Sequence, residues 1–135
     1  MNLTESIQAR IDALFPGLLG ITLIEVTPDR VIATLMVRPE LCTTGNILHG
    51  GAIMTFADTL GAVATVVNMP ADHRTVTIES KTNFTGGAAA GTRVTGTCTP
   101  VHKGRSTQVW QTEIRAENGK LAALVTQTQL VLPAT

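Results

Sequence analysis

The chain has 135 residues, 44% of them hydrophobic and 15% charged, so it is long enough for one folded domain and too apolar for a disordered chain. Ten Lys and Arg residues balance ten Asp and Glu residues, which excludes a nucleic-acid binder with a basic surface and a basic membrane-surface protein. The two cysteines, Cys42 and Cys98, belong to no cysteine or histidine cluster. We therefore expect no disulfide framework, no metal site and a cytoplasmic location.

The N-terminal segment has a helical pattern. Apolar residues recur at helical spacing over residues 1–15, and Asn2 with Glu5 resembles a capping box. We predict a helix there that Pro16 and Gly17 end. Acidic residues interrupt the segment and it has no continuous apolar core, which argues against a secretory signal peptide.

Two β-branched stretches follow, residues 21–27 and 30–37, and they predict a β-hairpin around Pro28 and Asp29. Residues 38–48 are irregular in pattern. They lead into the most apolar part of the chain.

Residues 49–68 predict one long helix. The stretch is about as long as a membrane helix, but His49 and Asp58 lie inside it and no Lys or Arg closely flanks it. We interpret it as a helix of a soluble protein, buried on most sides and not in a membrane.

After this helix the hydrophobic period becomes that of strands. In the first strand, simple alternation places Val76, Ile78 and Ser80 on one face. Asn118-Gly119 is typical of a type I′ hairpin turn between the last two strands. The predicted strands span residues 74–84, 92–101, 107–116 and 121–132.

These elements predict an α+β fold in a single domain over residues 1–135, with an antiparallel sheet curling around the central helix. Trp110, on a central strand, is expected in the core. One sheet cannot cover so apolar a helix on every side, so we also expect a second subunit against it.

The sequence His49-Gly50-Gly51 opens the predicted central helix. Glycine allows close backbone approach at a helix start, where unpaired N–H groups and the positive end of the dipole can stabilise an oxyanion. The alternative is a pair of loop glycines that only ends the preceding segment.

Asp58 is the only ionisable residue between Gly50 and Asp72. It stands among apolar neighbours such as Phe56 and Leu60, where a carboxylate is costly unless donors hold it. The alternative is a solvent-facing residue on a partly exposed stripe.

Gly50 and Asp58 lie eight residues apart, about 12 Å along a helix and about 80° around it. They cannot touch one substrate carbonyl from the same chain. Two antiparallel copies of the helix would bring Gly50 of one subunit opposite Asp58 of the other. If the pair is catalytic, the active form must be at least a dimer with two equivalent sites at the interface.

The run from Leu48 to Ala52, followed by Asp58, resembles the hotdog acyl-CoA thioesterases of the phenylacetate-degradation and 4-hydroxybenzoyl-CoA thioesterase type. The resemblance covers residues 35–132. It implies a hotdog fold and an enzyme that hydrolyses an acyl- or aryl-acyl-CoA thioester to the free acid and coenzyme A, without a cofactor. It also implies a homodimer at least, with a homotetramer as the expected form.

By this resemblance, the Gly50 N–H would polarise the thioester carbonyl. Asp58 would act either as the nucleophile, through a mixed anhydride, or as the general base on water. His49 would orient the thioester or its leaving group, with a neutral capping histidine as the alternative. Thr77 matches a position where the family often places a hydroxyl near the attacking water, and an ordinary exposed strand threonine fits the pattern as well.

Other residues are expected to bind the substrate or to line its pocket. The chain has Thr43 where many relatives have Asn or Gln, and Ala62 where some relatives have Ser or Thr. Aspartate at position 58 favours the phenylacetate-type branch. The motif of the later strands, residues 100–105 followed by residues 108–111, favours the other branch. The expected binding and lining residues are Thr43, Gly51, Met54, Phe56, Leu60 and Ala62.

The only local basic cluster comprises His102, Lys103 and Arg105. Relatives use the matching turn to contact the nucleotide end of coenzyme A, and Gly104, Arg105 and Ser106 could supply backbone donors and an arginine fork to phosphate. A solvated hairpin turn is the alternative.

Two other functions fit a fold of this class. A hotdog hydratase would place a histidine and an acid in a different helix motif, with a Pro-Gly near the helix start, and that pattern is absent. A non-catalytic acyl-CoA binding or sensing module would keep the pocket without the acid, so Asp58 argues against it.

Overall fold

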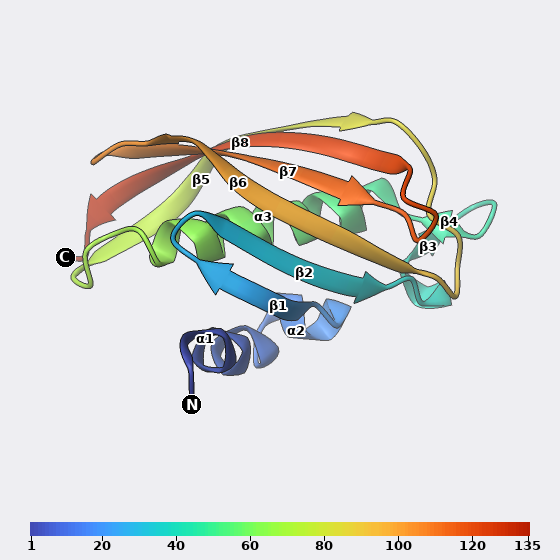
Figure 1. Ribbon diagram of the computed structural model, residues 1–135, viewed down its shortest axis with the longest axis horizontal. Helices are drawn as coiled ribbons and strands as arrows, with labels where there is room; N and C mark the ends of the chain where they lie inside the picture. The colour runs from blue at the N-terminus through green and yellow to red at the C-terminus, as the bar shows by residue number, and fades with distance from the viewer.

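A computed structural model describes residues 1–135. Its helices are α1 (Leu3–Asp12), α2 (Phe15–Leu19) and α3 (Gly50–Val66). The main strands are β1 (Thr22–Thr27), β2 (Arg30–Met36), β5 (His73–Phe84), β6 (Arg93–Lys103), β7 (Thr107–Arg115) and β8 (Leu121–Pro133). These six form one antiparallel sheet in the order β1-β2-β6-β7-β8-β5, which arches over α3 (Figure 1). The predicted α+β arrangement is confirmed.

The core lies between α3 and the sheet. Phe56 and Leu60 of α3 are 0% exposed and pack closely on Gly96 of β6, where a Cβ would lie only 3.1 Å from Phe56 and 3.0 Å from Leu60. The expectation that Phe56 and Leu60 line a substrate pocket is therefore wrong, because both side chains face the sheet. Trp110 is also 0% exposed, and its Nε1 donates a 3.0 Å hydrogen bond to Thr65 Oγ1, which confirms its place in the core.

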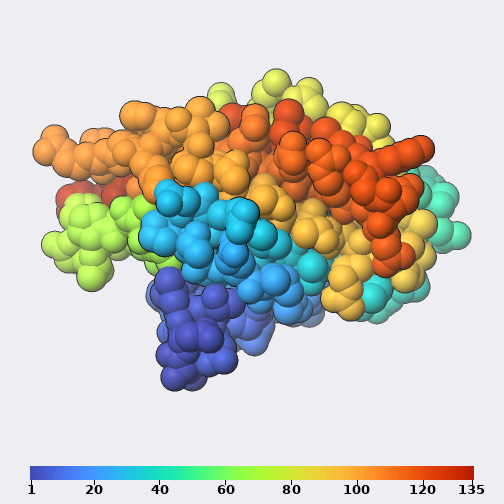
Figure 2. Space-filling model, viewed as in Figure 1, coloured from blue at the N-terminus to red at the C-terminus, as the bar shows by residue number.

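The N-terminal segment forms two helices instead of one. Asn2 caps α1, and its capping box with Glu5 is present as predicted. The helix stops at Asp12, however, and Pro16 and Gly17 lie inside α2. Proline is tolerated in the first turn of a helix because the N–H it lacks has no acceptor there, so Pro16 begins a new helix and does not end the old one. Figure 2 shows the N-terminal segment protruding from the body of the molecule.

The two edge strands of the sheet differ in how they are covered. At the β1 edge, Gln8 of α1 donates from Nε2 to the Ile21 carbonyl at 2.9 Å and accepts from the Leu23 N–H at 2.6 Å. This side-chain amide occupies backbone groups that a further strand would otherwise pair with. The other edge, β5, pairs with β8 on one side only.

Residues 38–48 contain a short 3₁₀ turn (Pro39–Leu41) and a small hairpin of β3 (Cys42–Thr43) and β4 (Ile47–Leu48). The β7–β8 turn also differs from the prediction. Only Gly119 has a positive φ there (87°), whereas a type I′ turn needs a positive φ at Asn118 as well. The Gly119 N–H donates to the Ala116 carbonyl, as in a type I turn whose last residue is left-handed.

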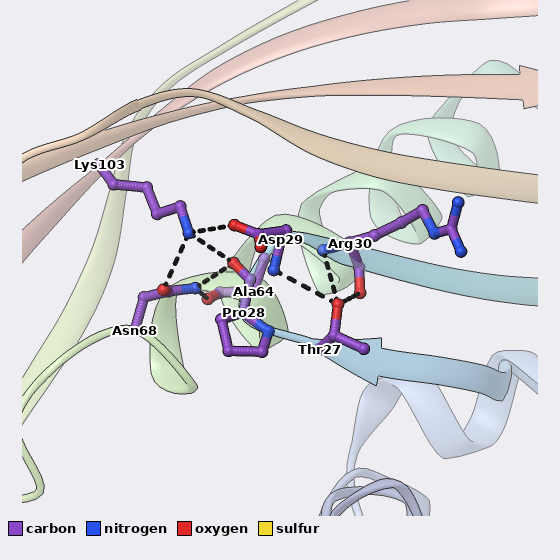
Figure 3. A network of polar contacts seen from close by, with 7 residues as sticks. All are labelled: Thr27, Pro28, Asp29, Arg30, Ala64, Asn68 and Lys103. Atoms are coloured by element: carbon purple, nitrogen blue, oxygen red, sulfur yellow. Dashed lines mark hydrogen bonds and ion pairs between the residues drawn. The ribbon is translucent and has the colours of Figure 1, made fainter.

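A polar cluster ties the β1–β2 turn to the C-terminal end of α3 (Figure 3). Lys103 Nζ lies 2.6 Å from Asp29 Oδ1, 3.0 Å from the Pro28 carbonyl and 3.5 Å from Asn68 Oδ1. Asn68 Nδ2 also donates to the Ala64 carbonyl at 2.9 Å. Lys103 therefore holds the end of the sheet against the helix.

Candidate active site

Asp58 lies in the middle of α3 and is half-buried. Its Oδ1 accepts a 2.6 Å hydrogen bond from Thr77 Oγ1 on β5. Asp58 lies on a partly exposed face of the helix, as one of the two alternatives left open by the sequence expected, and the Thr77 hydroxyl holds its carboxylate there.

The face of α3 that carries Asp58 is the one that the sheet leaves uncovered. Nine of the 17 helical residues are buried, and six of the other eight fall on one stripe at helical spacing. Met54 on this stripe is 38% exposed. The unburied residues of the stripe are Gly51, Met54, Thr55, Asp58, Ala62 and Val66.

The start of α3 is capped by its own histidine. His49 Nδ1 accepts a 2.8 Å hydrogen bond from the Gly51 N–H, and the His49 carbonyl accepts from Ala52 and Ile53. The Gly50 N–H, as the first of the helix, has no acceptor within it. Because Nδ1 accepts, the neutral His49 ring carries its proton on Nε2. The capping histidine left open by the sequence is present, and the Gly51 N–H is engaged by it.

Asp58 and Gly50 belong to the same continuous helix, so about 12 Å of helix separates them. The structure brings Asp58 together with Thr77 and keeps it apart from the Gly50 N–H of its own chain. One chain therefore holds a backbone donor at the helix start and a carboxylate at the helix middle, too far apart to contact the same atom.

Three hollows lie along the uncovered stripe of α3. The largest, about 730 Å³, lies at the helix start and includes His49, Gly51 and Cys42. The second, about 370 Å³, is lined by Phe15, Met54, Thr55, Asp58, Thr77 and Ser80. The third, about 270 Å³, is an apolar groove between α1 and α3 with Asp58 and Ala62 in its wall. Asp58 thus stands between two hollows, while Thr43 lines none of the three.

A β-bulge next to Thr77 changes which side chains of β5 face the helix. Thr77 pairs with Gln129 and Glu79 pairs with Thr128, so Ile78 is an extra residue. The predicted alternation is therefore wrong beyond Ile78, because Ser80 lies on the same face as Thr77 and not with Val76. Ser80 Oγ is buried without a hydrogen-bond partner in the hollow that holds Asp58.

Sequence reasoning missed Ser80 and two glutamines of β8. Gln127 and Gln129 are 1% and 0% exposed, and both lie on the inner face of an otherwise apolar strand. Their spacing of two residues within LVTQTQLV was a signal in the sequence, because polar residues on the buried face of a strand need partners.

The basic turn between β6 and β7 lies near the C-terminal end of α3, the end opposite Gly50, as the Lys103–Asn68 contact shows. The Gly104 N–H donates to the Thr107 carbonyl at 2.9 Å, so this backbone donor is used within the turn. Lys103 is paired with Asp29. Arg105 and Ser106 are exposed, and Arg105 makes no ion pair.

The structure contains no group of three His, Cys, Asp or Glu side chains that could hold a metal ion. None of its helices has the length and apolar character needed to cross a membrane.

A curled antiparallel sheet around a long helix, with a glycine pair at the helix start and a held carboxylate at its middle, defines a class of hotdog enzyme. The sequence profile of the Thioesterase superfamily matches residues 45–123, more than half of the chain, and the chain belongs to this family. The predicted hotdog fold and thioester hydrolase class are thereby confirmed.

Individual relatives agree with this assignment. The 1,4-dihydroxy-2-naphthoyl-CoA hydrolase of Escherichia coli is 32% identical over 128 residues, which is 95% of this chain and 93% of that protein. A thioesterase of Haemophilus influenzae superposes with a TM-score of 0.92 at 26% identity, over 99% of this chain and 93% of the other. The PaaI protein of the phenylacetic acid degradation operon of Escherichia coli shares the fold, with a TM-score of 0.86 at 24% identity over 98% of this chain and 93% of the other.

Proposed function

We propose that the protein hydrolyses an acyl- or aryl-acyl-CoA thioester to the free acid and coenzyme A, at a site shared by two subunits. The observation that carries this proposal is the 2.6 Å hydrogen bond by which Thr77 holds Asp58 on the uncovered face of α3, beside a hollow open to a substrate. The hydrolase of 1,4-dihydroxy-2-naphthoyl-CoA among the relatives supports a coenzyme A ester with an aromatic acyl group.

Two observations support a second subunit: the distance between Gly50 and Asp58 within one chain, and the exposed surface along β5 and α3. The β5 edge lacks the cover that Gln8 provides at the β1 edge, and unpaired strand edges tend to pair with another strand. Ile78 and Phe84 of β5 are 56% and 53% exposed. A second copy joined at β5 would cover these side chains and the stripe of α3. A homotetramer would be two such dimers.

In this arrangement the Gly50 N–H of one subunit donates to the thioester oxygen, and the helix dipole favours the negative charge that develops there. Asp58 of the other subunit either attacks the carbonyl carbon or removes a proton from water. By the first route the C–S bond breaks, a mixed anhydride forms, and water then hydrolyses it to the free acid while coenzyme A leaves as the thiol. By the second route the water oxygen forms the C–O bond, the C–S bond breaks, and the proton from water ends on the sulfur of coenzyme A.

The turn at Gly104, Arg105 and Ser106 would bind the nucleotide end of coenzyme A. Lys103 and the Gly104 N–H are engaged within the fold, whereas the Arg105 guanidinium and the exposed Ser106 are free to contact phosphate. No cofactor is required for this chemistry, and we propose a cytoplasmic location, where coenzyme A esters occur.

A panel of acyl-CoA and aryl-acyl-CoA thioesters, monitored by release of free thiol, tests the function. We expect turnover of at least one ester and its loss in Asp58→Ala, with binding of the ester retained. Absence of turnover by the folded protein on the whole panel would contradict the proposal. Binding without turnover would then favour an acyl-CoA sensing module.

A further inference from the structure

A chain of hydrogen bonds runs from the backbone of α3 through the buried glutamines of β8 to the exposed Thr77 and then to Asp58. Gln127 Nε2 donates to the Ala57 carbonyl at 2.8 Å, and Gln127 Oε1 accepts from Gln129 Nε2 at 2.5 Å. Gln129 Nε2 also donates to Thr77 Oγ1 at 2.6 Å. Thr77 in turn donates to Asp58 Oδ1. The chain therefore starts and ends on neighbouring residues of one helix.

The direction of every bond in this chain follows from its first member. A backbone carbonyl can only accept, so the amide nitrogen of Gln127 must face Ala57 and its oxygen must face Gln129. That oxygen needs a donor, which places the amide nitrogen of Gln129 toward both Gln127 and Thr77. The Thr77 oxygen thus receives a hydrogen bond, and its only proton is left for Asp58.

The opposite side of Gln129 agrees with this orientation. Thr75 Oγ1 lies 2.8 Å from Gln129 Oε1 and 3.1 Å from the Leu130 carbonyl, and its single proton is shared between these two acceptors. The flipped amide would direct its oxygen at Gln127 Oε1, where two acceptors would face each other. The orientation of Gln129 is therefore set by Gln127, and the Thr75 hydroxyl is compatible with it.

The fold makes room for this chain at a cost. Gln127 and Gln129 are almost fully buried, where an amide destabilises the folded state unless its hydrogen bonds are made. Gly61 of α3 packs directly on the Gln127 amide, and any Cβ at this position would overlap it. Apolar side chains at positions 127 and 129 would fill the core without needing hydrogen-bond partners.

We propose that Gln129 is a positioning residue of the thioesterase site, which acts through Thr77 to present a hydroxyl proton to the Asp58 carboxylate, with Gln127 fixing its orientation. The inference rests on the proposed role of Asp58. It adds that the carboxylate receives its hydrogen bond from the sheet of its own subunit, whereas the oxyanion donor comes from the other subunit.

A double-mutant cycle on kcat tests this role. We expect Gln129→Met to lower kcat about tenfold with KM within about twofold, since Thr77 loses the hydrogen bond that directs its proton toward Asp58. Thr77→Val should lower kcat at least as much, and the double variant should be no slower than Thr77→Val alone, because Gln129 acts only through Thr77. The proposal would be overturned if the loss of kcat in the double variant equalled the product of the two single losses. It would also be overturned if the folded Gln129→Met variant had an unchanged kcat.

Gln108→Met is the matched control. Gln108 pairs with Gln129 in the neighbouring strand and is 2% exposed, yet it makes no hydrogen bond to the chain described above. Its substitution should leave kcat within about twofold if buried amides as such do not matter. If Gln129→Met does not fold, Gln127→Met replaces it in the cycle, with a smaller expected loss and the same requirement of non-additivity.

A second measurement needs no substrate and so separates this inference from the proposed function. In the free protein, Asp58→Ala should shift the side-chain amide resonances of Gln129 in a ¹H–¹⁵N spectrum and leave those of Gln108 in place. Unmoved Gln129 resonances would overturn the inference even if the enzyme hydrolyses thioesters. Shifted resonances would support it even if every tested ester proved a poor substrate.

Discussion

Thr77 of β5 donates a 2.6 Å hydrogen bond to Asp58 of α3, although 19 positions separate the two residues in the chain. The hydrogen bond fixes the orientation of the Asp58 carboxylate, as both of its proposed roles require. The bulge at Ile78, which starts directly after Thr77, changes the face of the residues that follow. The contact thus depends on the local shape of one strand.

This contact predicts the effect of changing Thr77. Thr77→Val keeps the shape of the side chain and removes the donor, so kcat should fall about ten- to hundredfold, as expected for loss of a hydrogen bond to a charged group. Thr77→Ser keeps the hydroxyl and should remain within a few-fold of the unaltered protein. Steady-state kinetics compare the two variants. Equal kcat values for Thr77→Ser and Thr77→Val would contradict the role of the hydroxyl.

The Gly50 N–H can be removed without disturbing the helix. Proline is accepted at the first helical position, and His49 before it already has the extended backbone that proline requires (φ −63°, ψ 138°). Gly50→Pro should lower kcat about 10²- to 10³-fold, the usual cost of losing an oxyanion donor.

Gly50→Ala is the control for that substitution. A Cβ at Gly50 would lie 3.2 Å from the Phe84 ring, so alanine introduces the same crowding as proline but keeps the N–H. The kcat of the alanine variant should exceed that of the proline variant at least tenfold. Similar losses in both variants would assign the effect to crowding and not to the donor.

A shared site predicts complementation between two inactive variants. In a mixed dimer of Asp58→Asn and Gly50→Pro chains, one of the two sites combines an intact Gly50 with an intact Asp58. Random assembly makes half of the dimers mixed, so co-expression should restore about a quarter of the normal activity. Activity no greater than that of either variant alone would contradict a site built from two subunits.

Arg105 is expected to bind the nucleotide end of the substrate. Arg105→Ala should raise KM for a CoA thioester about tenfold, the effect of losing one charge-assisted hydrogen bond to phosphate. It should leave KM for an N-acetylcysteamine thioester unchanged, because that substrate lacks the nucleotide. Arg115→Ala, at the other end of β7, is the control and should change neither value.

The two cysteines should differ in reactivity. Burial raises the pKa of the Cys98 thiol to about 11, an effect that a hydrogen bond with Thr112 only partly offsets. At pH 8 its thiolate is therefore scarce, and the 0% exposed side chain is shielded from reagents. Ellman's reagent should label only the half-buried Cys42 in the native protein and both thiols after unfolding. Labelling of the native Cys42→Ser variant would contradict this prediction, because Cys98 is its only thiol. If the variant is not labelled, it gives no background signal in assays that measure thiol release.

The sequence by itself determined the elements and the family. Periodicity placed the strands within a residue or two of their observed ends, since burial on one face imposes a period of two. The helix at 49–68 was predicted from its apolar run, and its true bounds are Gly50–Val66. The His49-Gly50-Gly51 motif and Asp58 could be recognised because the chemistry of a helix start and of a carboxylate in apolar surroundings is local.

Only the tertiary structure decided which hydrogen bonds these residues receive. No local pattern distinguishes the bulge at Ile78 from regular alternation, because the extra residue is defined by its pairing with β8. Gln129 meets Thr77 across 52 positions of chain, and such a contact depends on strand register. The buried amides of β8 thus became interpretable only when the neighbours that satisfy their hydrogen bonds were in place.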